Sequence, residues 1–191
     1  MIEVFVARLS AYFLCLLLIP FSVLSESQQR LDPALKISKW KAVNQGFSLE
    51  LVQVNKDYAR AVFYARGLPE EVVEDIGRYC IFGSIVKNLS ALPLTYRLAD
   101  WRVVAASGTE HKMKLKSEWI KEWSAKGVGF RWLLLADEQT FDEGDWIQGF
   151  TTMALKPGET FDLHYSWSVQ GKIYHQTFKG MQCAPAKTDA P

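Results

Sequence analysis

Short stretches of alternating apolar and polar residues recur along this chain, with turn residues between them. Residues 47–51 read FSLEL, and residues 163–167 read LHYSW. Because successive side chains of a strand point to opposite faces of a sheet, this alternation is typical of strands with one buried face. About seven or eight such strands predict a mainly β fold, an immunoglobulin-like antiparallel β-sandwich with one or two short helical excursions.

The last two strands can be aligned residue by residue. Gln170 and Gly171 suit a two-residue hairpin turn, which places Trp167 opposite Tyr174 and Val169 opposite Lys172. In this register the core face carries Leu163, Tyr165, Trp167, Tyr174 and Phe178, and the polar face carries Asp162, His164, Ser166, His175 and Thr177.

The same patterns predict the other elements. Strands are expected at 59–65, paired with 47–51 in a hairpin, and at 79–86, 94–105, 130–135, 147–155, 160–168 and 172–178. A short helix is expected at 68–77, where Pro69 and two acidic residues suit a helix start. A second helix is expected at 117–127, with Ser117 as its cap and Gly127 as its left-handed exit.

The N-terminal 25 residues have the layout of a secretory signal peptide. Arg8 precedes an uncharged run from Leu9 to Leu24, and the small residue Ser25 follows. This run is shorter than the roughly 20 apolar residues of a membrane span, so cleavage after Ser25 is favoured over an uncleaved anchor. We therefore expect a periplasmic or secreted protein without a transmembrane span. Its parts are a signal peptide at 1–25, a flexible or loosely packed lead-in at 26–45, one sandwich domain at 46–184 and a disordered tail at 185–191.

The two cysteines that follow the signal peptide are expected to form a disulfide. Cys80 and Cys183 would lie in a compartment that permits oxidation. A free thiol pair and a thiolate metal site are the alternatives, but neither has support from the spacing, because the chain has no C-x-x-C motif.

The charge balance argues against a nucleic-acid partner. The net charge is +1, and removal of residues 1–25 takes away one acid, Glu3, and one base, Arg8. A chain this neutral has no broad basic surface for nucleic acid or anionic lipid.

The predicted 117–127 helix carries the first candidate site. Trp119 and Trp123 are four residues apart and therefore share one side of the helix. An exposed ring there would suit contact with another cell-envelope protein. Protein–protein contact by an exported accessory module is the leading functional hypothesis. The alternative is that both rings close the end of the sandwich as a lid.

A metal site is the second candidate. His164 and His175 fall on one face of the last hairpin, and His111 and Met113 form an H-x-M pair elsewhere. Imidazole and thioether ligands in an oxidising compartment would suit copper. The alternative places these histidines on solvated strands, with no cofactor bound.

Enzymatic activity finds no support in local motifs. The chain lacks both the G-x-S-x-G elbow and the H-E-x-x-H zinc helix. A non-enzymatic role is therefore favoured. A further alternative is a small-ligand or glycan binder in which Trp119, Trp123 or Trp146 provides an aromatic platform.

Overall fold

The computed structural model describes residues 27–32 and 37–186. The predicted signal peptide at 1–25 and the end of the predicted tail, 187–191, lie outside these residues. Within the described ranges, no helix has both the length and the apolar character needed to cross a membrane.

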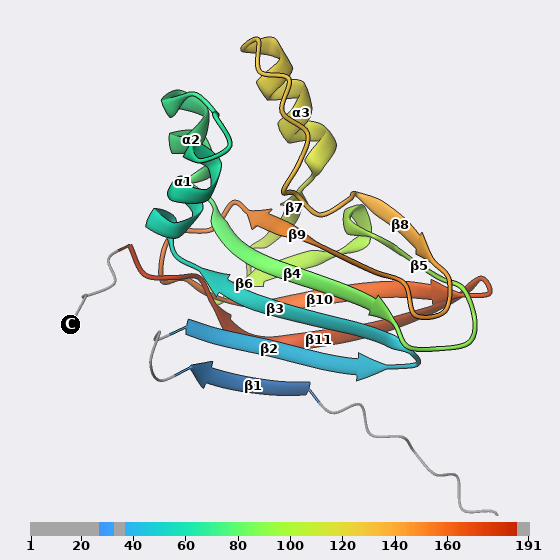
Figure 1. Ribbon diagram of the computed structural model, residues 1–191. Coiled ribbons are helices and arrows are strands. Elements are labelled where there is room, and N and C mark those ends of the chain that lie inside the picture. Colours follow the sequence, from blue (N-terminus) through green and yellow to red (C-terminus); the bar gives the residue numbers. More distant parts are fainter. Residues whose placement is uncertain (1–26, 33–36, 187–191) are drawn as a thin grey trace, which may run out of the picture.

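The chain forms a mainly β structure with short helices (Figure 1). The strands are β1 Ser27–Asp32, β2 Ile37–Asn44, β3 Phe47–Val54, β4 Cys80–Asn88, β5 Leu94–Arg97, β6 Arg102–Ala105, β7 Glu110–Lys114, β8 Glu138–Phe141, β9 Trp146–Met153, β10 Thr160–Val169 and β11 Lys172–Gln182. The helices are α1 Lys56–Tyr64, α2 Glu70–Ile76 and α3 Lys116–Ala125, with a 3-10 turn at Leu98–Asp100. The predicted mainly β fold with short helical excursions is confirmed, and the narrower immunoglobulin-like assignment stays a prediction.

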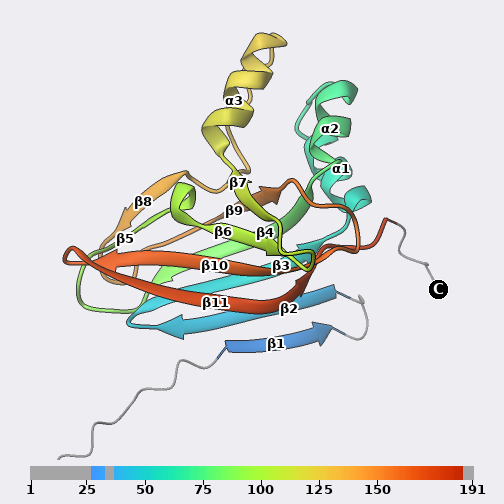
Figure 2. The ribbon, with the colours of Figure 1, turned by 180° about the vertical axis from the view of Figure 1, so that it is seen from behind.

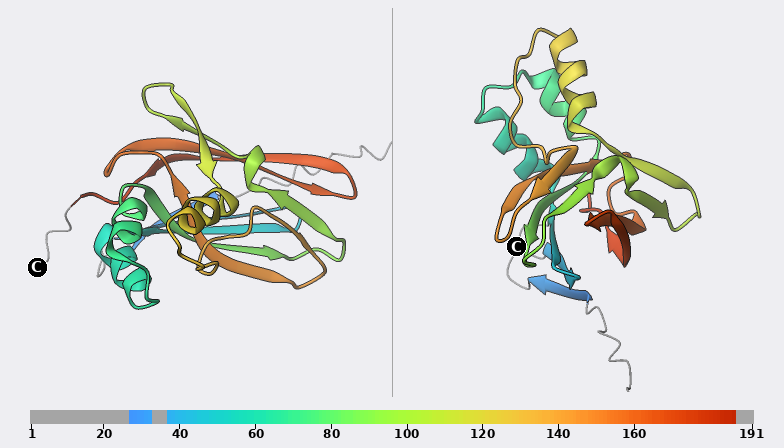
Figure 3. Two further views of the ribbon diagram at one scale, coloured as in Figure 1. Left: turned by 90° about the horizontal axis from the view of Figure 1, so that it is seen from above. Right: turned by 90° about the vertical axis from the view of Figure 1, so that its right-hand side faces the viewer.

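Two antiparallel layers make up the strand framework. The first sheet has the order β1-β2-β3-β4-β9, and in the second sheet β10 pairs with β11 on one side and with β5 and β6 on the other. The short strand β7 pairs with both β6 and β9, so it joins the two layers at one edge. The second sheet lies in front in the view from behind (Figure 2), and Figure 3 shows the layers from two further sides.

The sandwich core fills the space between the layers. Alternate residues along the strands of each sheet point into this core, including Trp40, Phe82 and Trp167. Phe47 of the first sheet stacks on Trp167 of the second, with ring centroids 4.8 Å apart. This apolar contact area is the main reason that the two sheets stay together.

The final hairpin has the register that its sequence predicts. Trp167 pairs with Tyr174, and Val169 pairs with Lys172. Gln170 and Gly171 adopt φ values of 49° and 80°, as the two-residue turn requires. The turn residues and the alternation therefore agree on one pairing.

The predicted strand at 59–65 is wrong, because this segment belongs to helix α1. The Asn55 side chain accepts a hydrogen bond from the Tyr58 amide and so caps the helix. Ala59 and Phe63, four residues apart, are its buried positions. The alternation of Ala61, Phe63 and Ala65 imitates a strand, but the helical spacing decides which residues are buried.

Three further segments differ from expectation. The predicted lead-in at 26–45 contains β1 and β2, and Trp40 of β2 is only 2% exposed because it packs into the sandwich core. The expected strand at 94–105 is divided by the turn at Leu98–Asp100. The expected strand at 130–135 is an irregular segment with a single bridge from Leu134 to Phe150. Strands β7 and β8 have no counterpart among the expected strands.

A second hydrophobic cluster, the helical core, lies on the outer face of the first sheet. It contains Val72, Val73 and Ile76 of α2 and the two tryptophans of α3. Ile81 of β4 and Val54 of β3 complete it from the sheet. The helices stand together at one end of the strands (Figure 1).

The start of α3 differs in one detail from the expected cap. Leu115, rather than Ser117, is the residue before the helix, and its amide donates to the Glu118 carboxylate. The Asp137 carboxylate accepts from the Lys116 and Ser117 amides, so a distant residue satisfies the free donors. Gly127 has φ +75°, as expected for the exit.

Candidate functional site

A shallow groove of about 400 Å³ lies on the outer face of the first sheet, next to the helices. We call it the sheet groove. Its lining consists of Val52, Tyr58, Gly83, Ser84, Ile85, Leu133, Gln148, Gly149 and Phe150.

The floor of the sheet groove is hollow because a glycine occupies the middle of strand β4. Gly83 is the cross-strand partner of Val52 on β3 and of Phe150 on β9. A Cβ atom built on Gly83 would come no closer than 3.9 Å to another residue. Packing within the protein therefore does not require glycine here, and an interior strand glycine is a place where another chain or a ligand can approach closely.

The walls of the sheet groove come from two distant parts of the chain. Tyr58 of α1 is 59% exposed on one side. On the other side Leu133 has φ +70°, a conformation that non-glycine residues rarely adopt. Its carbonyl accepts from the Phe150 amide at 2.6 Å, which fixes the wall against β9.

A second glycine allows this wall to approach. A Cβ atom on Gly149 would lie 2.5 Å from the Leu135 amide nitrogen. Only glycine permits that distance, so a side chain here would push residues 133–135 away from β9. The two glycines thus have different roles: Gly149 lets the wall close in, and Gly83 leaves space.

Positive charge predominates on the exposed part of the same face. Arg30 on β1 is the cross-strand partner of Lys39 on β2, which in turn is opposite Val52 at the floor of the sheet groove. Lys41 shares that face and forms an ion pair with Glu50, with 3.6 Å between Nζ and Oε2. The bases on this face are Arg30, Lys39, Lys41 and Lys87, and the acids are Asp32 and Glu50.

An exposed tryptophan extends the apolar surface along β9. Trp146 is 58% exposed and is the cross-strand partner of Lys87. The Lys87 ammonium lies 6.0 Å from the centre of the Trp146 ring. Trp132, 72% exposed, precedes the wall residue Leu133. From the sequence alone Trp146 is a candidate ligand platform, whereas no local pattern distinguishes Trp132.

The predicted contact residues of α3 have a different role. Trp119 and Trp123 are only 1% and 2% exposed, and their rings lie 5.7 Å apart inside the helical core. The Trp119 indole donates to the Thr152 hydroxyl at 2.8 Å. The prediction that these rings contact a partner is corrected, because they are covered by α1, α2 and β9. The lid alternative also expects buried rings, but both lie in the helical core and not in the sandwich core.

The predicted metal ligands are divided between the two faces of the second sheet. His164 is opposite Arg102, and its Nδ1 lies 2.9 Å from the Thr177 hydroxyl on the outer face. His111 is instead opposite Val103, which faces the sandwich core. Met113 is buried in that core. His175, opposite Ser166, therefore cannot share a metal with Met113 through this sheet.

Among residues 27–32 and 37–186, no three or more His, Cys, Asp or Glu side chains are placed to hold a metal ion.

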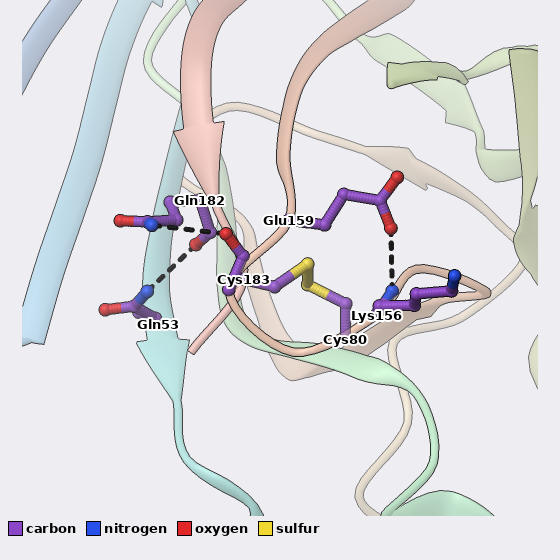
Figure 4. The surroundings of a disulfide bond; sticks show 7 residues. Gln53, Cys80, Lys156, Glu159, Gln182 and Cys183 are labelled. Carbon is purple, nitrogen blue, oxygen red and sulfur yellow. Dashed lines mark hydrogen bonds between the residues drawn. A yellow bond between two sulfur atoms is a disulfide. The ribbon is translucent and has the colours of Figure 1, made fainter. Parts of the chain in front are cut away.

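The predicted disulfide is confirmed. Cys80 at the start of β4 is bonded to Cys183 just after β11, with 5.4 Å between their Cα atoms. Hydrogen bonds hold the same region: the Cys183 amide donates to the Glu159 carbonyl, and the Gln53 side chain donates to the Gln182 carbonyl, each at 2.9 Å. Figure 4 shows the disulfide and the hydrogen bond from Gln53 to Gln182 beside it. The disulfide connects the first sheet to the C-terminal end of the second.

Comparison with known proteins gives little further information. The chain matches no family profile and no curated protein. A crystal structure of a DUF4426 family protein from Pseudomonas aeruginosa is similar over 84% of this chain and 97% of that chain, with 9% sequence identity and a TM-score of 0.37. Such a similarity is too low to assign a function.

Proposed function

We propose that this protein is an exported, non-enzymatic binding module that holds a segment of another cell-envelope protein in the sheet groove. The predicted signal peptide and the disulfide support export. The hollow at Gly83 is the observation that carries the proposal, since the packing of the chain itself gives no reason for a glycine there.

The shape of the sheet groove favours a polypeptide segment over an enclosed small ligand. Small-ligand sites usually cover most of the ligand surface, whereas this groove is shallow and open along the sheet. Its floor offers half-buried apolar side chains from Val52, Ile85 and Phe150. An apolar side chain of the partner would fill the space above Gly83, with Tyr58 as an exposed aromatic contact beside it and Trp146 as another farther along β9.

The charge of the surrounding face indicates the chemistry of that segment. Four bases and two acids share this face, so its net charge is +2 from Arg30, Lys39, Lys41 and Lys87 against Asp32 and Glu50. A partner segment with acidic residues on either side of its apolar anchor would be complementary. Added salt would slow its association, because exposed charges are screened.

Filling the hollow tests the proposal directly. The probe is a synthetic peptide with a Leu-Phe centre flanked by Asp and Glu, added to the isotope-labelled protein and followed by NMR. We expect chemical-shift changes at Gly83 and Phe150. We expect Gly83→Val to weaken binding at least about tenfold, about 1.4 kcal/mol. The same variant should be more stable by about 0.5 to 1 kcal/mol, because glycine is unfavourable inside a strand.

Two controls separate this site from general effects. Gly129→Val adds the same side chain at an exposed loop position where a Cβ would meet nothing within 4 Å, and it should leave binding unchanged. A peptide with Lys in place of Asp and Glu should bind more weakly. Unchanged binding by Gly83→Val, or shifts confined to the second sheet, would show that the partner does not use the sheet groove.

A further inference from the structure

Every sulfur-bearing side chain in the described part of the chain belongs to the sandwich core. These residues are Cys80, Met113, Met153, Met181 and Cys183, and none is more than 4% exposed. Buried methionines usually serve packing alone, so their arrangement relative to one another decides whether they can do more.

Strand pairing places three of these residues in succession, and the disulfide adds a fourth. Cys80 of β4 is the cross-strand partner of Met153 of β9, and Met153 is the partner of Met113 of β7. Cross-strand partners have Cβ atoms about 4.5 to 5.5 Å apart. The disulfide adds Cys183 at the Cys80 end of this row. Met153 therefore lies beside the disulfide, and Met113 lies one strand further along on the same face of the sheet.

From this arrangement we propose that reduction of the disulfide creates a binding site for one Cu(I) ion. Its ligands are the sulfurs of Cys80, Cys183, Met113 and Met153. Met181, on β11 two residues before Cys183, is not one of these ligands. Thiolate and thioether ligands are soft donors that select Cu(I) over harder divalent ions. This site shares only Met113 with the histidine set considered from the sequence.

The disulfide controls access to this site. A dithiol reductant attacks one sulfur of the disulfide, forms a mixed disulfide and releases the other cysteine as a thiol. Its second thiol then breaks the mixed disulfide. Two electrons and two protons pass to Cys80 and Cys183, and the reductant becomes a disulfide. Cu(I) then displaces the thiol protons. In the oxidised protein the cysteines carry no thiolate, so only thioethers remain.

The C-terminal residues cover the approach to the disulfide. A crevice of about 20 Å³ beside the two cysteines is lined by Tyr79, Pro157 and residues 184–186. The Ala184 carbonyl accepts from the Gly158 amide at 3.1 Å, which holds this cover in place. A reductant that enters through this crevice therefore has to displace residues 184–186.

A Cu(I) titration against the chelator bicinchoninate tests the site. We expect one Cu(I) per chain after reduction with a phosphine, and no stoichiometric binding by the disulfide form. Met113→Leu with Met153→Leu should lower the Cu(I) affinity at least about tenfold. Substitution of residues that only contact metal ligands already lowers metal affinity on this scale. Leucine has a similar volume, so this variant should fold. His164→Ala with His175→Ala is the matched control and should bind Cu(I) unchanged.

The fold of the reduced protein is followed in the same samples by circular dichroism. If reduction loosens the protein, Cu(I) should restore its structure, because metal binding then contributes to folding. Three results would overturn the proposal: no Cu(I) bound after reduction, equal affinity of the Met→Leu variant, or loss of affinity in the histidine control. Equal affinity would indicate coordination by the two thiolates alone.

Discussion

The sandwich core and the helical core are two hydrophobic clusters on opposite faces of the first sheet, and strands β3 and β4 contribute residues to both. Phe82 of β4 points into the sandwich core, whereas its neighbour Ile81 points into the helical core. The sandwich core is enclosed by two sheets and a disulfide. The helical core depends on helices of nine, seven and ten residues, which are too short to be stable alone. The sheets are therefore the scaffold, and the helices persist because they pack on it.

Polar contacts between the helices add little to the stability of the helical core. The Lys126 ammonium, just beyond α3, donates to the carboxylates of Glu71 and Asp75 on α2, each at 2.6 Å. These hydrogen bonds, which the Asp75 and Glu71 carboxylates accept, raise the pKa of Lys126 above its ordinary value. Exposed ion pairs of this kind add little stability and are screened by salt. Apolar burial against the first sheet remains the main support of the helical core.

Removal of the disulfide should cause the largest loss of stability, and it should affect both cores. In the chain-entropy model, a bridge closing a loop of about 100 residues stabilises a protein by up to about 4.7 kcal/mol. We expect Cys80→Ala with Cys183→Ala to lose a large part of that free energy of unfolding, measured by urea denaturation. Because Cys80 begins the shared strand β4, both cores should weaken. A loss below about 1 kcal/mol would mean that hydrogen bonds alone hold the C-terminal residues.

A pair of phenylalanine variants separates the two cores. Phe82 and Phe63 are both fully buried, one in each core. Truncation of either to alanine should cost about 3 to 4 kcal/mol. We expect Phe82→Ala to speed hydrogen exchange throughout both sheets, and Phe63→Ala to speed it mainly in α1 and α2. Uniform exchange in both variants would contradict the division and show a single cooperative unit.

The parts of the fold that the sequence predicts are those with local signals, and the parts it misses depend on packing between distant segments. The β10–β11 hairpin follows from Gln170, Gly171 and a regular alternation, which are all local signals. The sequence of helix α1 predicts a strand because its alanines fit either period, and only packing on the sheet selects Ala59 and Phe63 as the buried pair. Strand β7 gives no alternation, because Met113 is its one buried residue.

The sequence does not predict the sheet groove, because the residues that line it are far apart along the chain. Gly83 is visible as a lone glycine in a strand, which is a known signal for close approach. Its two walls, Tyr58 and Leu133, come from a misassigned helix and an irregular segment. Their positions depend on the helical core, which is a tertiary feature without a local signature.

The smallest expected effect concerns two tyrosines in the sandwich core. The Tyr96 hydroxyl donates to the Ala136 carbonyl at 3.0 Å, whereas the Tyr165 hydroxyl has no hydrogen-bond partner among the described residues. We expect Tyr96→Phe to lower the free energy of unfolding by about 1 kcal/mol, and Tyr165→Phe to leave it unchanged or raise it by a similar amount. Urea denaturation at neutral pH measures both. Equal losses would indicate that a buried water satisfies Tyr165.

The same two tyrosines should also affect stability at alkaline pH. Burial raises the pKa of Tyr165 above its ordinary value, and burial together with the Asp137 charge raises the pKa of Tyr96. The folded protein therefore holds both phenol protons more tightly than the unfolded chain. Stability from this source is complete below the unfolded pKa of about 10 and is lost as the pH rises above it. Each Tyr→Phe variant should lose less stability between about pH 9 and pH 11 than the parent protein, and an identical decline in all three would assign the alkaline sensitivity to other groups.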